Sequence, residues 1–273
     1  MNIVLIAPRY PYGKDQIYLS VSVTAVAARL IAMEHIVDIV DLNIDRLESQ
    51  RVQELMQKAN FVGISLTGSP NIPGVIKLIP KLRMVAPNTT ILLGGQVVKQ
   101  LTRDQFTQLF GNFGRVFQIN KREDLAQALG CEKNSIPPLE SVSFIPVWQK
   151  MGEERMILYL EREGALAVSQ GCKFNCSFCG AQKGEDEEFL RSAENFEADL
   201  QYLVALAKSH GLSKLEFYAT SLDFFQNPNL VREQLEILAK VRKESGVDVR
   251  VRCLSCFTSF IDAEKIIPNL KDL

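Results

Sequence analysis

The chain has 273 residues, and its 31 Lys and Arg against 32 Asp and Glu give a net charge of −1, so no global basic field points to nucleic acid as a partner. Apolar residues make up 47% of the chain and charged residues 23%, which is typical of a globular protein rather than a disordered one. No run of about 18 apolar residues occurs, so no membrane partner is expected. Six cysteines in a chain without a recognisable signal peptide favour metal or redox chemistry in a reducing, cytoplasmic setting.

Residues 1–130 alternate between strand and helix patterns. Strands are predicted at 3–7, 36–42, 61–66, 91–93 and 116–119. Helices are predicted at 21–33, 46–59, the stretch that ends at 85, 102–110 and 122–129. Pro73 and Pro80 are expected to begin or kink the third helix. The alternation predicts an α/β fold with a doubly wound parallel sheet, in which ligands bind beyond the carboxyl ends of the strands.

Residues 131–164 interrupt this alternation. Prolines lie among polar residues there, so we expect a linker that packs against the second half through Phe144 and Trp148. The second half then restarts the alternation. Strands are predicted at 165–169, 215–218 and 247–254, and helices at 193–209, 228–245 and 262–270. Asn227 is expected to cap the middle helix and Gly246 to end it.

Three cysteines lie within eight residues, directly after a predicted strand: Cys172, Cys176 and Cys179. Such a loop can wrap its sulfurs around one centre. Three thiolate ligands without a nearby fourth suit an iron–sulfur cluster that keeps one iron open, whereas a four-cysteine zinc site needs a distant ligand. The alternative is a zinc-stabilised α/β protein that uses Cys176, Cys179, Cys253 and Cys256.

The Cys-x₃-Cys-x₂-Cys spacing, with Phe178 directly before the last cysteine, resembles the radical S-adenosylmethionine (SAM) superfamily. The preceding segment 168–171 fits as well, because those enzymes place this loop after the first barrel strand. The resemblance implies a [4Fe–4S] cluster held by Cys172, Cys176 and Cys179. It further implies that the open iron chelates SAM, and that one electron from the reduced cluster cleaves SAM to a 5′-deoxyadenosyl radical.

The resemblance also implies residues and partners around SAM. Phe178 is expected near the adenine, and Thr220 and Ser221, after a later predicted strand, near the methionine end of SAM; the alternative is an ordinary polar turn. Implied partners are a small-molecule or peptide substrate and an electron donor such as a flavodoxin or a ferredoxin.

The first half is similar to the cobalamin-binding domains that precede the radical SAM domain in one class of this superfamily. The similar segments are an early Pro/Tyr-rich loop at 8–12, a Ser/Thr turn at 65–68 and the glycine pair 94–95. The resemblance implies cobalamin contacts from five residues: Ser65, Thr67, Gly68, Gly94 and Gly95. The Asp-x-His-x-x-Gly segment that supplies a histidine ligand to cobalt is absent, and His35 is expected to be structural. A domain that has lost cobalamin is therefore the alternative.

The length of the second half bears on function. An eight-unit barrel takes about 250 residues, so residues 165–273 leave room for roughly three or four strand–helix units. We therefore expect an incomplete radical SAM barrel at 165–273, after a cobalamin-binding-like domain at 1–130 and a linker at 131–164. The predicted function is reductive cleavage of SAM to modify an unidentified substrate, with cobalamin-dependent methyl transfer as one form. The alternative is a catalytically incomplete fragment that binds cobalamin or a partner chain completing the barrel.

Two pairs of residues lie on or at the end of the predicted strand 247–254. Cys253 and Cys256 form a Cys-x-x-Cys segment, for which buried strand positions are favoured over a metal or redox site. Arg250 and Arg252 alternate on this strand. One of them is expected to face SAM, and the alternative is an ion-paired face.

Overall fold

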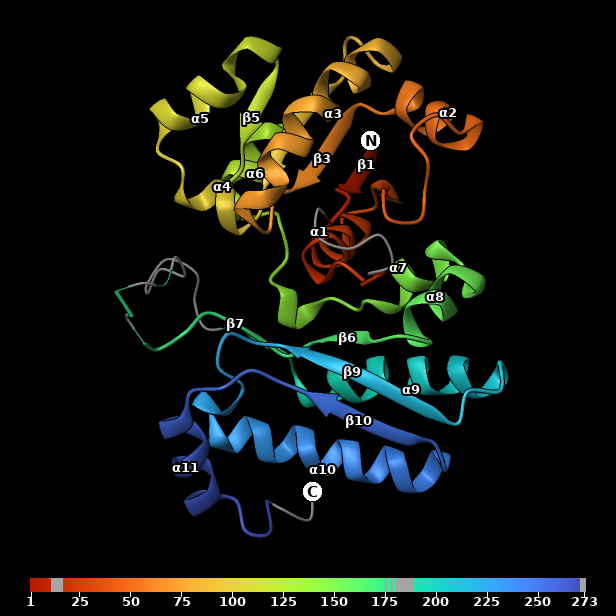
Figure 1. Ribbon diagram of the computed structural model, residues 1–273, viewed down its shortest axis with the longest axis vertical. Coiled ribbons are helices and arrows are strands. Elements are labelled where there is room, and N and C mark those ends of the chain that lie inside the picture. The colour runs from red at the N-terminus through yellow and green to blue at the C-terminus, as the bar shows by residue number, and fades with distance from the viewer. Residues whose placement is uncertain (11–16, 175, 178, 180–188, 271–273) are drawn as a thin grey trace. The chain divides into compact units, whose positions relative to one another are not determined.

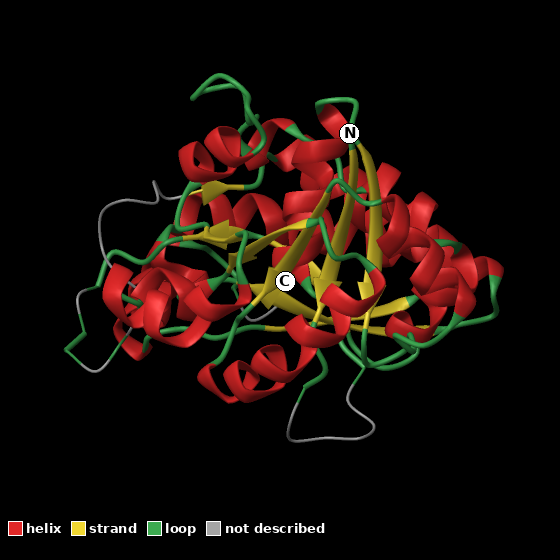
Figure 2. Ribbon diagram, turned by 90° about the horizontal axis from the view of Figure 1, so that it is seen from above, coloured by secondary structure: helices red, strands yellow, loops and turns green. Residues whose placement is uncertain are grey.

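The computed structural model describes residues 1–10, 17–174, 176–177, 179 and 189–270. The chain forms two compact units, Met1–Pro137 and Pro138–Leu273. In each unit the strands are flanked by helices (Figures 1 and 2). No described helix has both the length and the apolar character that crossing a membrane requires.

The first unit is built on a parallel sheet with the strand order β2-β1-β3-β4-β5. Its strands are β1 (Asn2–Ala7), β2 (Ile36–Asp41), β3 (Phe61–Ser65), β4 (Thr90–Gly94) and β5 (Val116–Gln118). Its helices are α1 (Val21–Ala32), α2 (Gln50–Lys58), α3 (Ile72–Val85), α4 (Gln96–Gln100), α5 (Arg103–Phe110) and α6 (Arg122–Ala128). The predicted doubly wound parallel sheet is confirmed, and the strand order reverses between β1 and β3.

Burial explains why the strands of this unit could be predicted from the sequence. Every residue of β1 after Asn2 is buried, as expected for a parallel strand covered on both faces. The helix α3 contains both prolines singled out in the sequence. Pro73 lies in its first turn, but Pro80 lies inside the helix, where Ile79 and Leu82 are buried against the core.

The second unit is built on a smaller parallel sheet with the strand order β10-β9-β6. Its strands are β6 (Gly164–Ala167), β9 (Lys214–Thr220) and β10 (Asp248–Arg252), with a separate antiparallel pair of β7 (Ser169–Gln170) and β8 (Phe189–Leu190). Its helices are α7 (Ile145–Met151), α8 (Glu153–Leu160), α9 (Ala193–Ser209), α10 (Pro228–Ser245) and α11 (Phe257–Ile266). A single-turn helix, η4 (Phe224–Gln226), follows β9.

The helix α10 begins and ends where its sequence predicts. The side chain of Asn227 accepts a hydrogen bond from the N–H of Leu230 at 3.4 Å, and Gly246 ends the helix in the left-handed conformation with φ of 69°. The helix α11 differs, because it begins at Phe257 rather than at 262. Cys256 is therefore the residue before a helix, and neither Cys253 nor Cys256 belongs to β10.

Residues expected to form a linker belong in large part to the second unit. The unit begins at Pro138, and α7 and α8 lie within the predicted linker. Trp148 is buried and stacks on Phe144 and Tyr202, with ring centroids 5.8 and 5.9 Å away. Both predicted anchors are therefore packed inside this unit.

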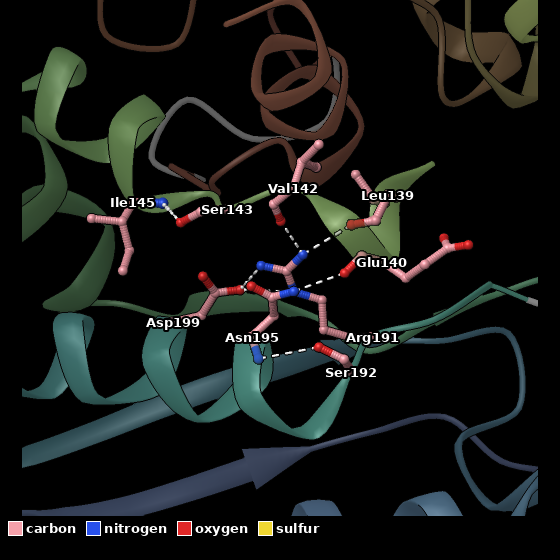
Figure 3. Close-up of polar contacts among 9 residues, drawn as sticks. All are labelled: Leu139, Glu140, Val142, Ser143, Ile145, Arg191, Ser192, Asn195 and Asp199. Atoms are coloured by element: carbon pink, nitrogen blue, oxygen red, sulfur yellow. Dashed lines mark hydrogen bonds and ion pairs between the residues drawn. The ribbon is translucent and has the colours of Figure 1, made fainter. Parts of the chain in front are cut away.

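Arg191 and Asn195 connect residues 139–144 to α9, and Nδ2 of Asn195 donates to the carbonyl of Glu140 at 2.7 Å (Figure 3). Arg191 makes the larger number of these contacts. Its side chain is fully buried, and its Nε and Nη2 donate to Oδ2 of Asp199 at 3.0 and 2.6 Å. Its Nη1 donates to the backbone oxygens of Leu139 and Val142. The guanidinium also stacks on Phe144, with 4.6 Å between its carbon and the ring centroid.

Candidate metal and cofactor site

The three-cysteine loop follows β6 and β7 at the carboxyl edge of the second sheet. Cys172 is partly buried, whereas Cys176 and Cys179 are exposed, and none of the three forms a disulfide. The backbone N–H of Cys179 donates to the carbonyl of Cys176 at 3.0 Å, which closes a turn between these two ligand candidates. Phe178, expected near the adenine of SAM, lies outside the described residues.

The donor set fits a cluster by its chemistry. Free thiols become thiolates when they bind iron, and three of them leave one iron of a four-iron cluster open. Within the described part of the chain, no three His, Cys, Asp or Glu side chains are grouped closely enough to hold a metal ion. The grouping of the loop thiols, like that of the alternative zinc set, therefore stays a prediction.

Thr220 and Ser221 lie at the end of β9, which pairs with β6. The Thr220 hydroxyl donates to the carbonyl of Leu166 at 2.9 Å, and the Ser221 hydroxyl shares a hydrogen bond of 2.7 Å with that of Ser169. The two residues expected to contact SAM thus lie beside the chain that leads into the cysteine loop. Both hydroxyls have hydrogen-bond partners within the unit.

Asp223 joins the end of β9 to the loop between β10 and α11. Its carboxylate is buried, and Oδ1 accepts from the Ser255 hydroxyl at 2.5 Å and from the N–H of Cys256 at 3.0 Å. Oδ2 accepts from the Ser259 hydroxyl at 2.7 Å. These contacts fix the position of the segment that follows β9.

The two remaining thiols of the second unit are not the buried strand residues that the sequence favoured. Cys253 is partly buried, and burial together with Asp223 raises the pKa of its thiol. Cys256 is exposed, and hydrogen bonds from the side chain and backbone of Thr258 lower the pKa of its thiol. β10 ends at Arg252, before both cysteines, and Cys256 directly precedes α11.

Both arginines of β10 are ion-paired. Nε and Nη2 of Arg252 donate to the two carboxylate oxygens of Glu163 at 2.8 Å each, and its guanidinium lies over the Tyr218 ring, 4.7 Å from the centroid. Arg250 pairs with Asp248 at 2.8 Å. The ion-paired alternative for this strand is therefore the one found.

The predicted cobalamin residues lie together at the carboxyl edge of the first sheet. β3 and β4 are neighbours, and Ser65 stands opposite Gly94 in their register. Thr67 and Gly68 follow β3 directly, and Gly95 follows β4. This edge borders the reversal of strand order between β1 and β3, the place where open α/β sheets bind ligands.

Gly95 is required by packing within this edge. Its φ is 104°, and a Cβ on it would lie 2.5 Å from the carbonyl oxygen of Leu66. The Ser65 hydroxyl shares a hydrogen bond of 2.9 Å with that of Ser22, at the start of α1. The early loop is described as far as Tyr10, whose N–H donates to Oδ1 of Asn43 at 2.9 Å.

Two residues at these edges were missed by the sequence analysis. Ser22 places a second hydroxyl next to Ser65, and its position at a helix start was the available signal. Gln226 contacts the backbone on both sides of Cys172. No pattern in a single sequence indicates a hydrogen bond between such distant residues.

Comparison with known proteins yields a structural likeness. No protein-family model matches the chain, and no curated protein matches it in sequence. Among solved structures, the chain is similar to the cobalamin-dependent S-adenosylmethionine radical enzyme OxsB with aqua-cobalamin bound. The TM-score is 0.61 and the identity 14%, over 87% of this chain and 37% of that one. The chain therefore spans well under half of that enzyme, and the likeness establishes the fold.

Proposed function

We propose that this chain provides the cluster-binding and cobalamin-binding parts of a radical SAM enzyme. One observation carries the proposal: the fold matches that of a cobalamin-dependent radical SAM enzyme, and the three-cysteine loop follows the first strand of the second parallel sheet. An oxygen-sensitive cluster and unbridged cysteines both suit a reducing cytoplasm.

In the second unit, the proposed ligands are the thiolates of Cys172, Cys176 and Cys179. When bound, the [4Fe–4S] cluster with SAM supplies a 5′-deoxyadenosyl radical on one-electron reduction. The chain's own residues orient and enclose these groups: Phe178 beside the adenine, and Thr220 and Ser221 beside the methionine end of SAM. A flavodoxin or ferredoxin is the proposed electron donor.

In the first unit, the proposed cobalamin site is the edge formed by the ends of β3 and β4. Ser65 and Thr67 offer hydroxyls, and the backbone at Gly68, Gly94 and Gly95 allows the close approach of a large ligand. With cobalamin bound, the reaction is methyl transfer to a small-molecule or peptide substrate. A further chain or segment that completes the barrel is the proposed source of the remaining substrate contacts.

The experiment is anaerobic reconstitution of the full chain with iron and sulfide, followed by iron counting, EPR and a 5′-deoxyadenosine assay after reduction. About four irons per chain with deoxyadenosine formation supports the proposal. A cluster without deoxyadenosine, together with cobalamin binding, favours the binding-module alternative. Stoichiometric zinc in place of iron contradicts the proposal.

Serine variants separate the cluster from the zinc alternative. Cys172→Ser is expected to abolish cluster formation, because a three-thiol site loses a third of its ligands. Cys253→Ser is the matched control and is expected to retain about four irons per chain. The reverse result, with metal kept in Cys172→Ser and lost in Cys253→Ser, assigns the metal to the four-thiol zinc set.

A further inference from the structure

Gln226 contacts the cysteine loop at two points with one side chain. Its Nε2 donates to the carbonyl of Gly171 at 3.1 Å, and its Oε1 accepts from the N–H of Lys173 at 3.0 Å. The side chain is buried, with 8% of the residue exposed. Its backbone carbonyl also accepts from Nζ of Lys173 at 3.4 Å.

These partners determine the chemistry that position 226 needs. The Gly171 carbonyl requires a donor and the Lys173 N–H requires an acceptor, so the orientation of the amide is fixed by its neighbours. A carboxylate at the same length supplies the acceptor but no donor. A thioether of the same length supplies neither in useful strength.

The two contacts flank a single residue. The Gly171 carbonyl belongs to the peptide plane before Cys172, and the Lys173 N–H to the plane after it. When both planes are fixed, the backbone dihedral angles of Cys172 are fixed, and with them the direction in which its Cβ leaves the chain. Gly171 itself has φ of 95°, so its backbone already lies in a conformation that favours glycine.

The segment that carries Gln226 is itself firmly held. The N–H of Phe224 donates to the carbonyl of Leu254 at 2.8 Å, and the N–H of Gln226 donates to the carbonyl of Asp223 at 3.2 Å. The Asp223 carboxylate is bound by the loop before α11, as described above. Because this turn is held in place at the sheet edge, the Gln226 side chain can hold the cysteine loop in a fixed position relative to the sheet.

We infer that Gln226 is a positioning residue, which holds Cys172 in the direction needed for the first cluster ligand. The inference rests on the proposed function, in which Cys172 binds iron. Residues that orient metal ligands from behind affect metal affinity by about ten-fold to a hundred-fold. Cys172 is partly buried, whereas the two other loop thiols are exposed. Cys172 is therefore the ligand candidate whose position the rest of the unit can fix.

The test uses three variants of the full chain. Gln226→Met keeps the length and removes both amide contacts, and Gln226→Glu keeps the contact to the Lys173 N–H. Gln234→Met is the matched control, because Gln234 is also a buried glutamine but its amide atoms have no hydrogen-bond partner among the described residues. After reconstitution, the loss of iron to a ferrous chelator and the EPR spectrum of the reduced cluster are measured.

The expected order is set by the number of contacts kept. Gln226→Met loses iron about ten-fold faster than the wild-type chain with an altered EPR spectrum, Gln226→Glu is intermediate, and Gln234→Met matches wild type. Wild-type iron loss and an unchanged spectrum in Gln226→Met overturn the inference. Equal acceleration in Gln234→Met also overturns it, since the effect then comes from general loss of packing.

A second readout needs no cluster. In the metal-free chain, mass spectrometry follows alkylation of each cysteine by iodoacetamide. Gln226→Met is expected to raise the rate at Cys172 several-fold and to leave the rate at Cys256 unchanged. If the wild-type chain takes up no iron, the proposed function fails. The alkylation rate then decides separately whether Gln226 holds Cys172, and an unchanged rate overturns that too.

Discussion

At the scale of single residues, the buried pair of Arg191 and Asp199 shows how one charged side chain holds a segment whose regular structure is a single short turn of helix. Burial raises the pKa of Asp199 to about 6 from its ordinary 3.8, and the neighbouring Arg191 opposes this shift. Burying this charged pair costs free energy. Hydrogen bonds from Arg191 to the backbone at Leu139 and Val142 offset part of that cost, because they satisfy further donors of the guanidinium. The sequence carried no sign of this pair, because an isolated arginine and aspartate look like ordinary surface residues.

The raised pKa of Asp199 predicts a pH dependence of stability. The Asp199 carboxyl binds its proton more tightly in the folded chain than in the unfolded chain. Protonation of Asp199 therefore stabilises the folded chain fully below about pH 4, and this stabilisation is lost as the pH rises to about 6. Relative to Asp199→Asn, which does not titrate, the wild type is expected to lose on the order of 1 to 3 kcal/mol over this range.

Urea unfolding at several pH values, followed by fluorescence, measures this difference. The single tryptophan, Trp148, is buried in the same unit and stacks on Phe144, so its emission reports unfolding around the pair. A difference that grows as the pH rises would mean that Arg191 outweighs burial and lowers the pKa of Asp199.

At the scale of elements, the long helices, the buried strands and the short α5, α6 and β5 were predictable, whereas α7 and α8 were not. α9 and α10 have capping residues and an apolar face that fix both ends in the sequence. α7 and α8 are short and interrupted by Gly152, and their stability comes from packing around Trp148 rather than from local pattern. The same limit applies to the site: the spacing of the cysteines is local and was visible, whereas the contacts of Gln226 are distant and were not.

The helix α10 contains one element-scale defect. Gln234 lies between Val231 and Leu238 on the buried face of the helix and is fully buried. Both of its amide atoms lack hydrogen-bond partners among the described residues, which costs stability. Gln234→Met is expected to raise the free energy of unfolding by about 1 kcal/mol in the same fluorescence assay. A loss of stability would show that the amide has a partner, such as a bound water.

At the scale of the whole molecule, the two-part organisation was predictable, and the boundary was not. Two separate runs of strand–helix alternation in the sequence predicted two parallel sheets, and both sheets are present. Residues 138–164 of the predicted linker belong to the second unit, and the hydrogen bonds of Arg191 hold the first of them there. Boundaries of this kind depend on long-range contacts, which a local pattern does not encode.

The second unit exposes apolar side chains in the segment that follows β10, the strand at one edge of its sheet in the described part of the chain. Four such residues lie beyond the strand: Leu254, Phe257, Phe260 and Ile266. Phe257 is 75% exposed and opens α11, where an acidic residue is favourable. If the chain self-associates through this surface, Phe257→Glu raises several-fold the concentration at which it does so, measured by sedimentation velocity. Unchanged association would exclude this surface as its cause.

The contacts of Gln226 also impose an order of events during synthesis. Gln226 follows Lys173 by 53 positions. At translation rates of about 5 to 20 residues per second, the cysteine loop leaves the ribosome roughly 3 to 10 seconds before Gln226 does. During that interval the thiols are available to any competing metal or oxidant in the cell. Under the proposed function, loading with iron has to wait until β9 and the turn that carries Gln226 have formed.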